Sequence, residues 1–389
     1  GSVETAGMKF LMICSYLPSA LNFRGKLLEA IHAQGYEIHV FAPDLTDFPD
    51  ELKRLQQVGY QVHCIPMQRA GTNPLADLKL LQTLYQMIRQ IQPDMVLSYT
   101  IKPVIYGTLA AWLARVPKRF ALITGLGYAF QNIESGKRSL FQKLVHGLYA
   151  QALKHAEKVF FQNPDDLKLF QDMNLLDANK PTVVVNGSGV NVQDFELMPL
   201  PLNEEGQVKA SFLLIARLLG DKGVREYAEA ARIIKAQYPE TEFHLVGWID
   251  DNPSAISQAE LDTWVQEKTV KYWGKLSDVR PAIAVSSVYV LPSYREGTPR
   301  TVLEAMAMGR AIITTDAPGC RETVSKGVNG YLVAVKSVDD LVQSMQYFIE
   351  DPQLITYMGQ RSREMALNKY DVHQVNRHML TEMQIIAKP

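Results

Sequence analysis

Short apolar runs alternate with amphipathic stretches along most of the chain. The apolar runs have the length and composition of buried strands, and the stretches between them have helical period. This alternation is typical of a parallel α/β sheet, in which each strand is followed by a crossover helix. In the first half of the chain the expected strands are 10–14, 37–43, 61–66, 94–98, 119–124, 157–161 and 182–185.

A second alternating series follows a turn-rich stretch at 186–206. Its expected strands are 210–216, 242–246, 270–273, 288–291 and 311–314. Two such series predict an α/β protein of two doubly wound, Rossmann-like domains that face each other across a cleft, over 8–190 and 206–368. Open α/β sheets bind ligands beyond the carboxyl ends of their strands, so we expect the functional residues there.

Composition and charge narrow the function further. The 389 residues contain 40 Lys and Arg against 41 Asp and Glu, which argues against a nucleic-acid partner because such proteins carry a basic face. No apolar run approaches the roughly 20 residues needed to span a bilayer, so we expect a cytoplasmic protein whose natural chain begins at Met8. No Asp-x-Asp occurs and the cysteines lack metal-binding spacing, so no metal and no cofactor are expected.

Two glutamates in the run 294–309 are the most informative residues. An expected buried strand precedes Glu296, and Thr298 and Pro299 are typical of an N-cap and a first helical residue. Glu296 is then expected in the loop, with Glu304 about two turns into the helix. A helix start presents backbone N–H groups to an anion, and one carboxylate for each sugar ring suits a sugar nucleotide. An isolated Glu pair at this spacing would more often be ordinary solvated surface.

Two cations follow the first expected strand of the second half. Arg217 provides a planar fork of donors and Lys222 a point charge, just before a helix that is expected to start near Val224. This arrangement predicts a clamp for a diphosphate. Either cation alone would more often belong to a solvated surface loop.

Together these residues resemble retaining glycosyltransferases of family 4 with the GT-B fold, over nearly the whole chain and most strongly from 217 to 330. The resemblance also implies that a final helix at 371–386 packs back on the first domain. The resemblance implies that Arg217 and Lys222 hold a nucleotide diphosphate, that Glu296 contacts the donor sugar and that Glu304 binds the ribose. The catalytic residues that the resemblance implies are Glu296, Arg217 and Lys222. The remaining implied donor-binding residues are Glu304, the segment Gly297, Thr298, Pro299, Arg300 and Thr301, and Gly125.

Within that family, the segments around Arg24, Lys102 and Gly125 are similar to bacterial enzymes that extend polyprenyl-diphosphate-linked oligosaccharides. The resemblance implies a UDP-hexose or UDP-N-acetylhexosamine donor, a polyprenyl-diphosphate saccharide acceptor, and a role in surface-glycan or protein-glycan assembly. Arg24 and Lys102 are the expected acceptor-binding residues. Arg24 could equally serve the donor diphosphate, or be a plain first-turn arginine.

Two features depart from the family pattern. Many members have a histidine at the end of the strand that reads 120–125 here, and none of the eight histidines falls there. In the family this histidine contacts the donor sugar, and we expect the backbone around Gly125 to make that contact here. The loop at 15–25 also lacks the paired glycines that many relatives place beside the donor phosphate.

The sequence leaves two other functions open. A UDP-sugar epimerase of similar two-domain form, or a non-catalytic saccharide-binding protein, would share parts of the pattern. The helix expected at 138–156 is strongly amphipathic, which a core helix explains, but docking on an anionic membrane at the inner face would give the same pattern.

Overall fold

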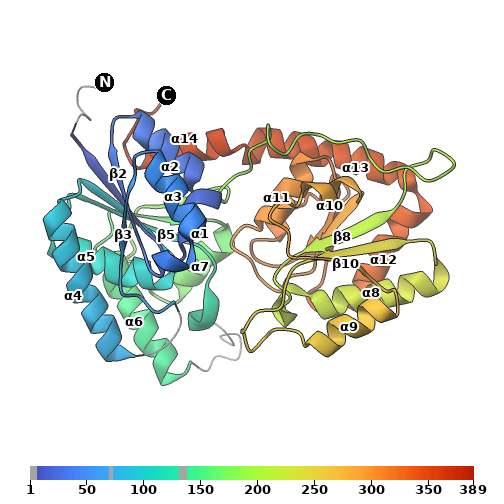
Figure 1. Ribbon diagram of the computed structural model, residues 1–389, viewed down its shortest axis with the longest axis horizontal. Helices are drawn as coiled ribbons and strands as arrows, with labels where there is room; N and C mark the ends of the chain where they lie inside the picture. The colour runs from blue at the N-terminus through green and yellow to red at the C-terminus, as the bar shows by residue number, and fades with distance from the viewer. Residues whose placement is uncertain (1–6, 70–72, 131–137) are drawn as a thin grey trace. The chain divides into compact units, whose positions relative to one another are not determined.

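The chain folds into two compact units, each built around a parallel β-sheet (Figure 1). The computed structural model describes residues 7–69, 73–130 and 138–389. The first unit comprises Gly1–Ser188 and Val375–Pro389, and the second comprises Gly189–Gln374. Two doubly wound, Rossmann-like sheets are present, which confirms the predicted fold class.

The first sheet has seven strands with the order β3-β2-β1-β4-β5-β6-β7. The strands are β1 (Lys9–Ile13), β2 (Glu37–Ala42), β3 (Gln61–Cys64), β4 (Met95–Tyr99), β5 (Lys118–Ile123), β6 (Lys158–Phe161) and β7 (Thr182–Val184). The helices are α1 (Leu17–Asn22), α2 (Gly25–Ala33), α3 (Pro49–Gln57), α4 (Pro74–Ile91), α5 (Thr108–Leu113), α6 (Leu140–Lys154) and α7 (Pro164–Asp172), with α14 (Val372–Glu382) at the end of the chain. The first unit also contains the short turns η1 (Leu45–Asp47), η2 (Pro103–Gly107) and η3 (Gly127–Phe130).

Helices cover both faces of this sheet (Figure 1). Alternate strand residues point to opposite faces, so Phe10 and Met12 pack with α2 and with Met379 and Met383 at the end of the chain. Leu11 and Ile13 belong to the core on the other face, with α4 and α5. The final helix is also tied to β6, because the Lys158 ammonium lies 2.8 Å from the Glu382 carboxylate.

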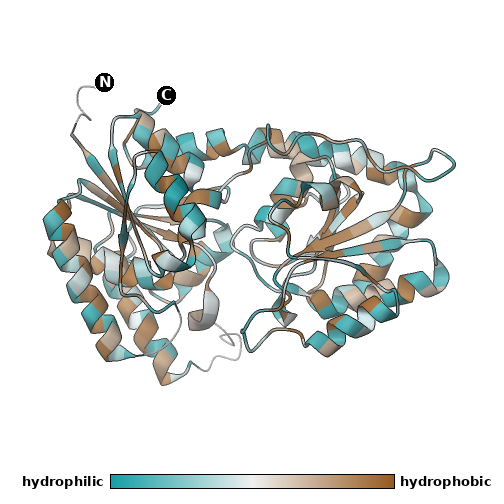
Figure 2. Ribbon diagram, viewed as in Figure 1, coloured by the Kyte–Doolittle hydropathy of each residue, from teal (hydrophilic) through white to brown (hydrophobic). Residues whose placement is uncertain are grey.

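The second sheet has six strands with the order β10-β9-β8-β11-β12-β13. The strands are β8 (Ser211–Ile215), β9 (Glu242–Val246), β10 (Lys271–Gly274), β11 (Val288–Leu291), β12 (Ala311–Thr315) and β13 (Gly330–Val333). The helices are α8 (Val224–Gln237), α9 (Gln258–Gln266), α10 (Arg280–Ala284), α11 (Arg300–Ala307), α12 (Val338–Glu350) and α13 (Pro352–Met365), with short turns η5 (Gly220–Lys222), η6 (Arg321–Thr323) and η7 (Ala366–Tyr370). The helices lie on both faces of the sheet (Figure 1), and the strands are the most hydrophobic elements (Figure 2).

The turn-rich stretch before β8 packs against the second unit. Arg310 is completely buried, and its guanidinium donates hydrogen bonds to the carbonyls of Met198 at 2.7 Å and Pro199 at 3.1 Å. Burial lowers the pKa of Arg310 to about 10. A buried cation needs such acceptors, so this contact attaches most of the expected linker to the C-terminal core.

Helix α6 is only partly explained as a core helix. Val145, Tyr149 and Leu153 are buried in the first unit, whereas Leu140 is 84% and Leu144 57% exposed. His146 on the same helix is buried as well. Within the described ranges, no helix has both the length and the apolar character required to cross a bilayer.

Candidate active site

The predicted donor residues lie at the point where the second sheet reverses its strand order. Strands β8 and β11 are neighbours, and the chain continues from β8 toward one edge of the sheet and from β11 toward the other. All pairings in this sheet are parallel, so the carboxyl ends of β8 and β11 lie at one edge. Arg217 and Lys222 follow β8, and Glu296 follows β11. A ligand site is expected at such a switch point.

The loops after β8 and β11 are in direct contact. The Tyr294 N–H donates to the Asp221 carbonyl at 2.9 Å. Gly223, which begins α8, has φ +76°, and a Cβ there would lie 2.1 Å from the Pro292 carbonyl oxygen. Only glycine therefore fits this approach of the two loops, and the contact places Lys222 beside the residues that follow β11.

Lys222 and Glu296 form an ion pair. The Lys222 Nζ lies 2.7 Å from the Glu296 Oε1, with 21% and 15% of the two side chains exposed. The Glu296 N–H donates to the Pro318 carbonyl at 3.0 Å, and a Cβ on Gly319 would lie 2.0 Å from the Glu296 carbonyl oxygen. The loop after β12 thus fixes the Glu296 backbone, and the pair is held in a partly desolvated position.

Glu304 is buried on α11, with 8% of the residue exposed. Its Oε2 lies 3.6 Å from the Arg300 Nε. Burial raises the pKa of Glu304 to about 7; the Asp278 carboxylate adds to the effect and the Arg300 cation opposes it. A carboxylate buried at this position gains stability from hydroxyl donors, as a ribose would provide.

The start of α11 differs from the sequence prediction. Pro299 has extended backbone angles and is the N-cap, and Arg300 is the first helical residue, so the assignment of Thr298 as N-cap and Pro299 as first helical residue was wrong by one position. Glu304 is consequently the fifth residue of the helix, nearer its start than predicted. The segment Gly297, Thr298, Pro299, Arg300 and Thr301 leads directly from Glu296 into this helix.

Tyr289, which the sequence analysis did not single out, connects these elements. Its buried hydroxyl donates to the Ile215 carbonyl at 3.0 Å and hydrogen-bonds the Thr301 hydroxyl at 2.5 Å. Burial raises the pKa of Tyr289 well above its usual value, and the charges of Glu304 and Glu296 act in the same direction. Tyr289 points inward from β11, and only the burial of that strand signals it in the sequence.

Arg217 has a different partner from the one expected of a diphosphate clamp. Its Nη1 lies 3.3 Å from the Asp250 Oδ2, and 46% of its side chain is exposed. The loop after β9 supplies Asp250. A half-exposed arginine in a single long contact can move to another anion with little loss, because exposed pairs contribute little to stability.

Cys320 is a second residue that sequence reasoning missed. It is completely buried, and burial raises the pKa of its thiol to about 12. The Glu296 carboxylate adds to this shift and the Lys222 ammonium opposes it. The thiol is therefore a buried, neutral group that is sensitive to the charges of Glu296 and Lys222.

The predicted acceptor residues lie in the first unit, at the equivalent switch point between β1 and β4. Arg24 is 3% exposed and precedes α2 as its N-cap residue; its guanidinium carbon lies 5.6 Å from the Tyr99 ring centre. It is therefore a buried cation beside an aromatic ring. Thr100, with φ +68°, follows β4, and its hydroxyl lies 2.9 Å from that of Ser15.

Lys102 and Gly125 differ in their exposure to solvent. The Lys102 Nζ lies 3.1 Å from the Asp77 Oδ1 with 5% of its side chain exposed, so its charge is already balanced. Gly125 is exposed, and a Cβ there would meet nothing within 4 Å. The backbone at Gly125 is thus accessible to a ligand.

A histidine does support the loop after β5, although it comes from α6. The His146 Nε2 lies 2.7 Å from the Ala129 carbonyl and its Nδ1 lies 3.2 Å from the Arg138 Nη1. Arg138 can only donate, so Nδ1 accepts and Nε2 carries the proton. Burial lowers the pKa of His146, which keeps the ring neutral. No sequence motif near Gly125 could reveal this contact.

Comparisons with known proteins identify the family to which the chain belongs. Residues 209–351 match the family model described as glycosyl transferases group 1, and residues 16–163 match that described as glycosyl transferase 4-like. The chain is 31% identical, over 91% of its length and 92% of the relative, to the N,N'-diacetylbacillosaminyl-diphospho-undecaprenol alpha-1,3-N-acetylgalactosaminyltransferase of Campylobacter jejuni. The chain belongs to the group 1, family 4-like glycosyltransferases. The predicted family is confirmed.

Further glycosyltransferases match at lower identity. The UDP-Gal:alpha-D-GlcNAc-diphosphoundecaprenol alpha-1,3-galactosyltransferase of Escherichia coli is 25% identical over 84% of this chain and 83% of its own. Among solved structures, Anabaena Alr3699/HepE in complex with UDP covers 97% of this chain and 100% of its own, at a TM-score of 0.74 and 18% identity. That likeness shows the shared GT-B fold. The comparisons support neither an epimerase nor a non-catalytic saccharide-binding protein.

Proposed function

We propose that this glycosyltransferase moves a hexose or N-acetylhexosamine from a UDP-sugar to a polyprenyl-diphosphate-linked saccharide. The Lys222–Glu296 ion pair, 2.7 Å long at the switch point of the second sheet, is the observation that carries the proposal. It combines a cation for a diphosphate with a carboxylate for sugar hydroxyls in one place. The C. jejuni and E. coli relatives, whose names specify diphospho-undecaprenol saccharides, support the acceptor class.

Donor binding exchanges the partners of this pair. The diphosphate takes the Lys222 ammonium, and the sugar hydroxyls donate to the Glu296 carboxylate that the lysine has left. Arg217 leaves Asp250 for the same diphosphate, and Glu304 accepts from the ribose hydroxyls. In the unliganded protein Glu296 and Asp250 therefore act as counter-ions that keep the clamp compact.

Transfer breaks the bond between the anomeric carbon and the diphosphate oxygen. Negative charge develops on the departing UDP, and Lys222, Arg217 and the start of α8 are positioned to neutralise it in place of a metal ion. The acceptor hydroxyl oxygen forms its bond to the anomeric carbon on the face that UDP leaves, and its proton passes to the departing phosphate oxygen. The anomeric configuration is retained.

The acceptor is presented from the first unit. Arg24, buried beside Tyr99 at the end of β4, supplies a cation for the acceptor diphosphate, and the accessible backbone at Gly125 contacts the donor sugar. An acceptor of this class resides in a membrane, so the enzyme works at the cytoplasmic face of the cytoplasmic membrane in surface-glycan or protein-glycan assembly.

A donor panel tests the proposal. The protein is incubated with UDP- and GDP-sugars and a polyprenyl-diphosphate saccharide, and products are identified by mass. The expected result is one UDP-sugar consumed and one sugar added to the lipid-linked saccharide. Conversion of a UDP-sugar without acceptor would instead indicate an epimerase, and saccharide binding without UDP binding in calorimetry would indicate a non-catalytic protein.

A further inference from the structure

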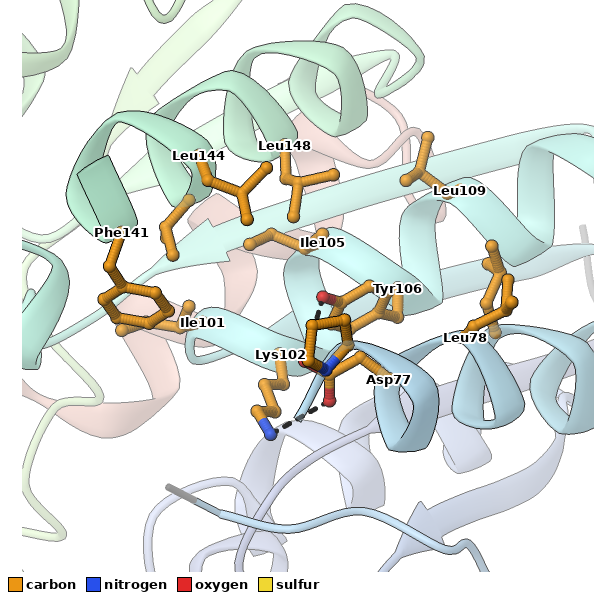
Figure 3. A pocket seen from close by; sticks show the side chains of 13 residues that line it. Asp77, Leu78, Ile101, Lys102, Ile105, Tyr106, Leu109, Phe141, Leu144 and Leu148 are labelled. Atoms are coloured by element: carbon orange, nitrogen blue, oxygen red, sulfur yellow. Dashed lines mark hydrogen bonds and ion pairs between the residues drawn. The ribbon is translucent and has the colours of Figure 1, made fainter. Parts of the chain in front are cut away.

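A cavity of about 320 Å³ lies in the first unit between α4, α6 and the segment formed by η2 and α5 (Figure 3). We call it the helix groove. Its lining residues are Pro74, Asp77, Leu78, Leu81, Ile101, Lys102, Ile105, Tyr106, Leu109, Phe141, Leu144, Val145 and Leu148. None of these positions is needed for donor binding.

The polar atoms of the helix groove are confined to one wall. The Asp77 carboxylate accepts from Lys102 Nζ at 3.1 Å and from the Tyr106 hydroxyl at 3.2 Å. This contact joins α4 to η2 and pairs the three groups with one another. Helix α6 contributes only apolar side chains to the opposite wall, where Leu144 and Leu148 point toward Ile105 (Figure 3). The surface left for an occupant is hydrocarbon.

One end of the helix groove lies at the ligand-binding edge of the sheet. Ile101 and Lys102 lie two and three residues beyond the end of β4, at the switch point where Arg24 is buried beside Tyr99. A cation at the strand ends and an apolar channel leading away from them match a molecule with an anionic head and a hydrocarbon chain. A sugar or nucleotide alone would leave the channel empty.

The opening of the helix groove is also apolar. Leu78 and Leu144 line it while remaining 55% and 57% exposed. One turn closer to the start of the same helices, Leu75 and Leu140 are 78% and 84% exposed but do not line the cavity. Leu78 and Leu144, which stay exposed at the mouth of the cavity, mark the part of this surface that an apolar molecule covers.

We propose that the helix groove binds the isoprenoid chain of the polyprenyl-diphosphate-linked acceptor. The inference rests on the proposed function and extends it to the part of the acceptor remote from the reaction. A protein segment fits less well, because its main-chain N–H and C=O groups need partners and Asp77, Lys102 and Tyr106 are bonded to one another. An isoprenoid chain has no such requirement.

Two leucines on α6 provide a matched test. Leu144→Gln changes the wall of the helix groove, and Leu140→Gln makes the same change one turn away, outside the cavity. Each variant of the full chain is assayed in detergent with two acceptors that share one saccharide diphosphate. One acceptor carries a long polyprenyl chain and the other a short alkyl group.

Leu144→Gln is expected to raise the KM for the polyprenyl acceptor about tenfold, equivalent to about 1.4 kcal/mol of lost apolar burial. Its kcat, and its KM for the alkyl acceptor, stay at the wild-type values. Leu140→Gln leaves all of these values unchanged. Leu78→Gln, on the α4 side of the groove, reproduces the effect of Leu144→Gln and guards against a purely local distortion of α6.

Three outcomes overturn the inference. Equal KM increases in Leu140→Gln and Leu144→Gln would mean that a membrane-like surface, and not the cavity, takes the lipid. Unchanged KM in both groove variants, with normal transfer, would show that the groove is unused while the proposed function stands. Failure of the wild-type protein to glycosylate either acceptor would overturn the proposed function itself, and this inference with it.

Discussion

The Lys222 ammonium and the Glu296 carboxylate neutralise each other across 2.7 Å, although they are separated by 74 positions in the sequence. The approach of the loop after β8 to the loop after β11, which the Gly223–Pro292 contact requires, brings them together. A donor diphosphate must therefore compete with Glu296 for Lys222, and this competition determines what each substitution does.

Replacing Glu296 separates binding from catalysis. In Glu296→Gln the lysine loses its anionic competitor, so UDP is expected to bind at least as tightly as to the wild type. Turnover is expected to fall at least roughly tenfold, about 1.4 kcal/mol of transition-state stabilisation. Calorimetry with UDP and initial rates with the donor sugar measure the two effects. Near-normal turnover would contradict the role of Glu296.

Removing the cation has the opposite effect on nucleotide binding. Lys222→Ala is expected to weaken UDP binding and reduce turnover at least roughly tenfold, since one charge-assisted contact to the diphosphate is lost. Lys271→Ala is the control, because Lys271 belongs to the same unit and is paired with Glu242 at 3.0 Å but is 63% exposed. If both variants bind UDP equally well, Lys222 is not a diphosphate ligand.

The contact between the two loops can be tested with a pair of glycines. Gly223 and Gly274 have φ +76° and +75°, but only Gly223 has a neighbour where a Cβ would lie. Gly223→Ala is expected to destabilise the protein by about 1 to 3 kcal/mol more than Gly274→Ala, because overpacking adds to the shared backbone strain. It also displaces Lys222, so activity falls. Denaturant unfolding that gives equal losses for both variants would refute the loop contact.

Glu304 makes stability depend on pH. Burial raises its pKa from 4.5 to about 7, so between these values the folded chain holds a proton that the unfolded chain has released. Its contribution is therefore most favourable below about pH 4.5 and declines as pH rises to about 7. Glu304→Gln removes the decline, and its stability relative to wild type should increase between pH 5 and pH 8 by on the order of 2 kcal/mol.

The change is measured from the unfolding free energies of the wild type and of Glu304→Gln at pH 5 and pH 8. A stability difference that does not change with pH would show that Glu304 is ionised in the folded protein throughout. UDP binding by Glu304→Gln should nevertheless be weaker than by wild type, because the ribose hydroxyls lose their charged acceptor.

The sequence predicted most of the strands, and the order of the elements around Glu296 and Glu304, because both depend on short-range patterns. Apolar runs bounded by turns identified every strand except β13 (Gly330–Val333), and the order of strand, loop and helix placed Glu296 and Glu304 near one helix start. Pro299 shows the limit of that precision: its ring suits the first helical position, but its ψ of 109° makes it the N-cap. Boundaries of this kind depend on the neighbouring backbone.

Contacts between distant segments could not be predicted. Lys102, an expected acceptor-binding residue, is paired with Asp77 from α4, and no local pattern joins these two residues. Asp250, Tyr289 and Cys320 likewise reach the site through sheet packing. The alternation along α6 indicated an apolar face; which leucines enter a core and which line a cavity is decided by α4 and η2.

In the mechanism that we propose, the second unit activates a UDP-sugar for retaining, metal-independent transfer to a lipid-linked saccharide. The most direct measurement is a reaction in excess EDTA with the selected donor and a polyprenyl-diphosphate saccharide, followed by mass spectrometry and NMR of the product's anomeric centre. We expect the mass of one added sugar in the anomeric configuration of the donor. An inverted linkage, or transfer abolished by EDTA and restored by a divalent metal, would contradict this account.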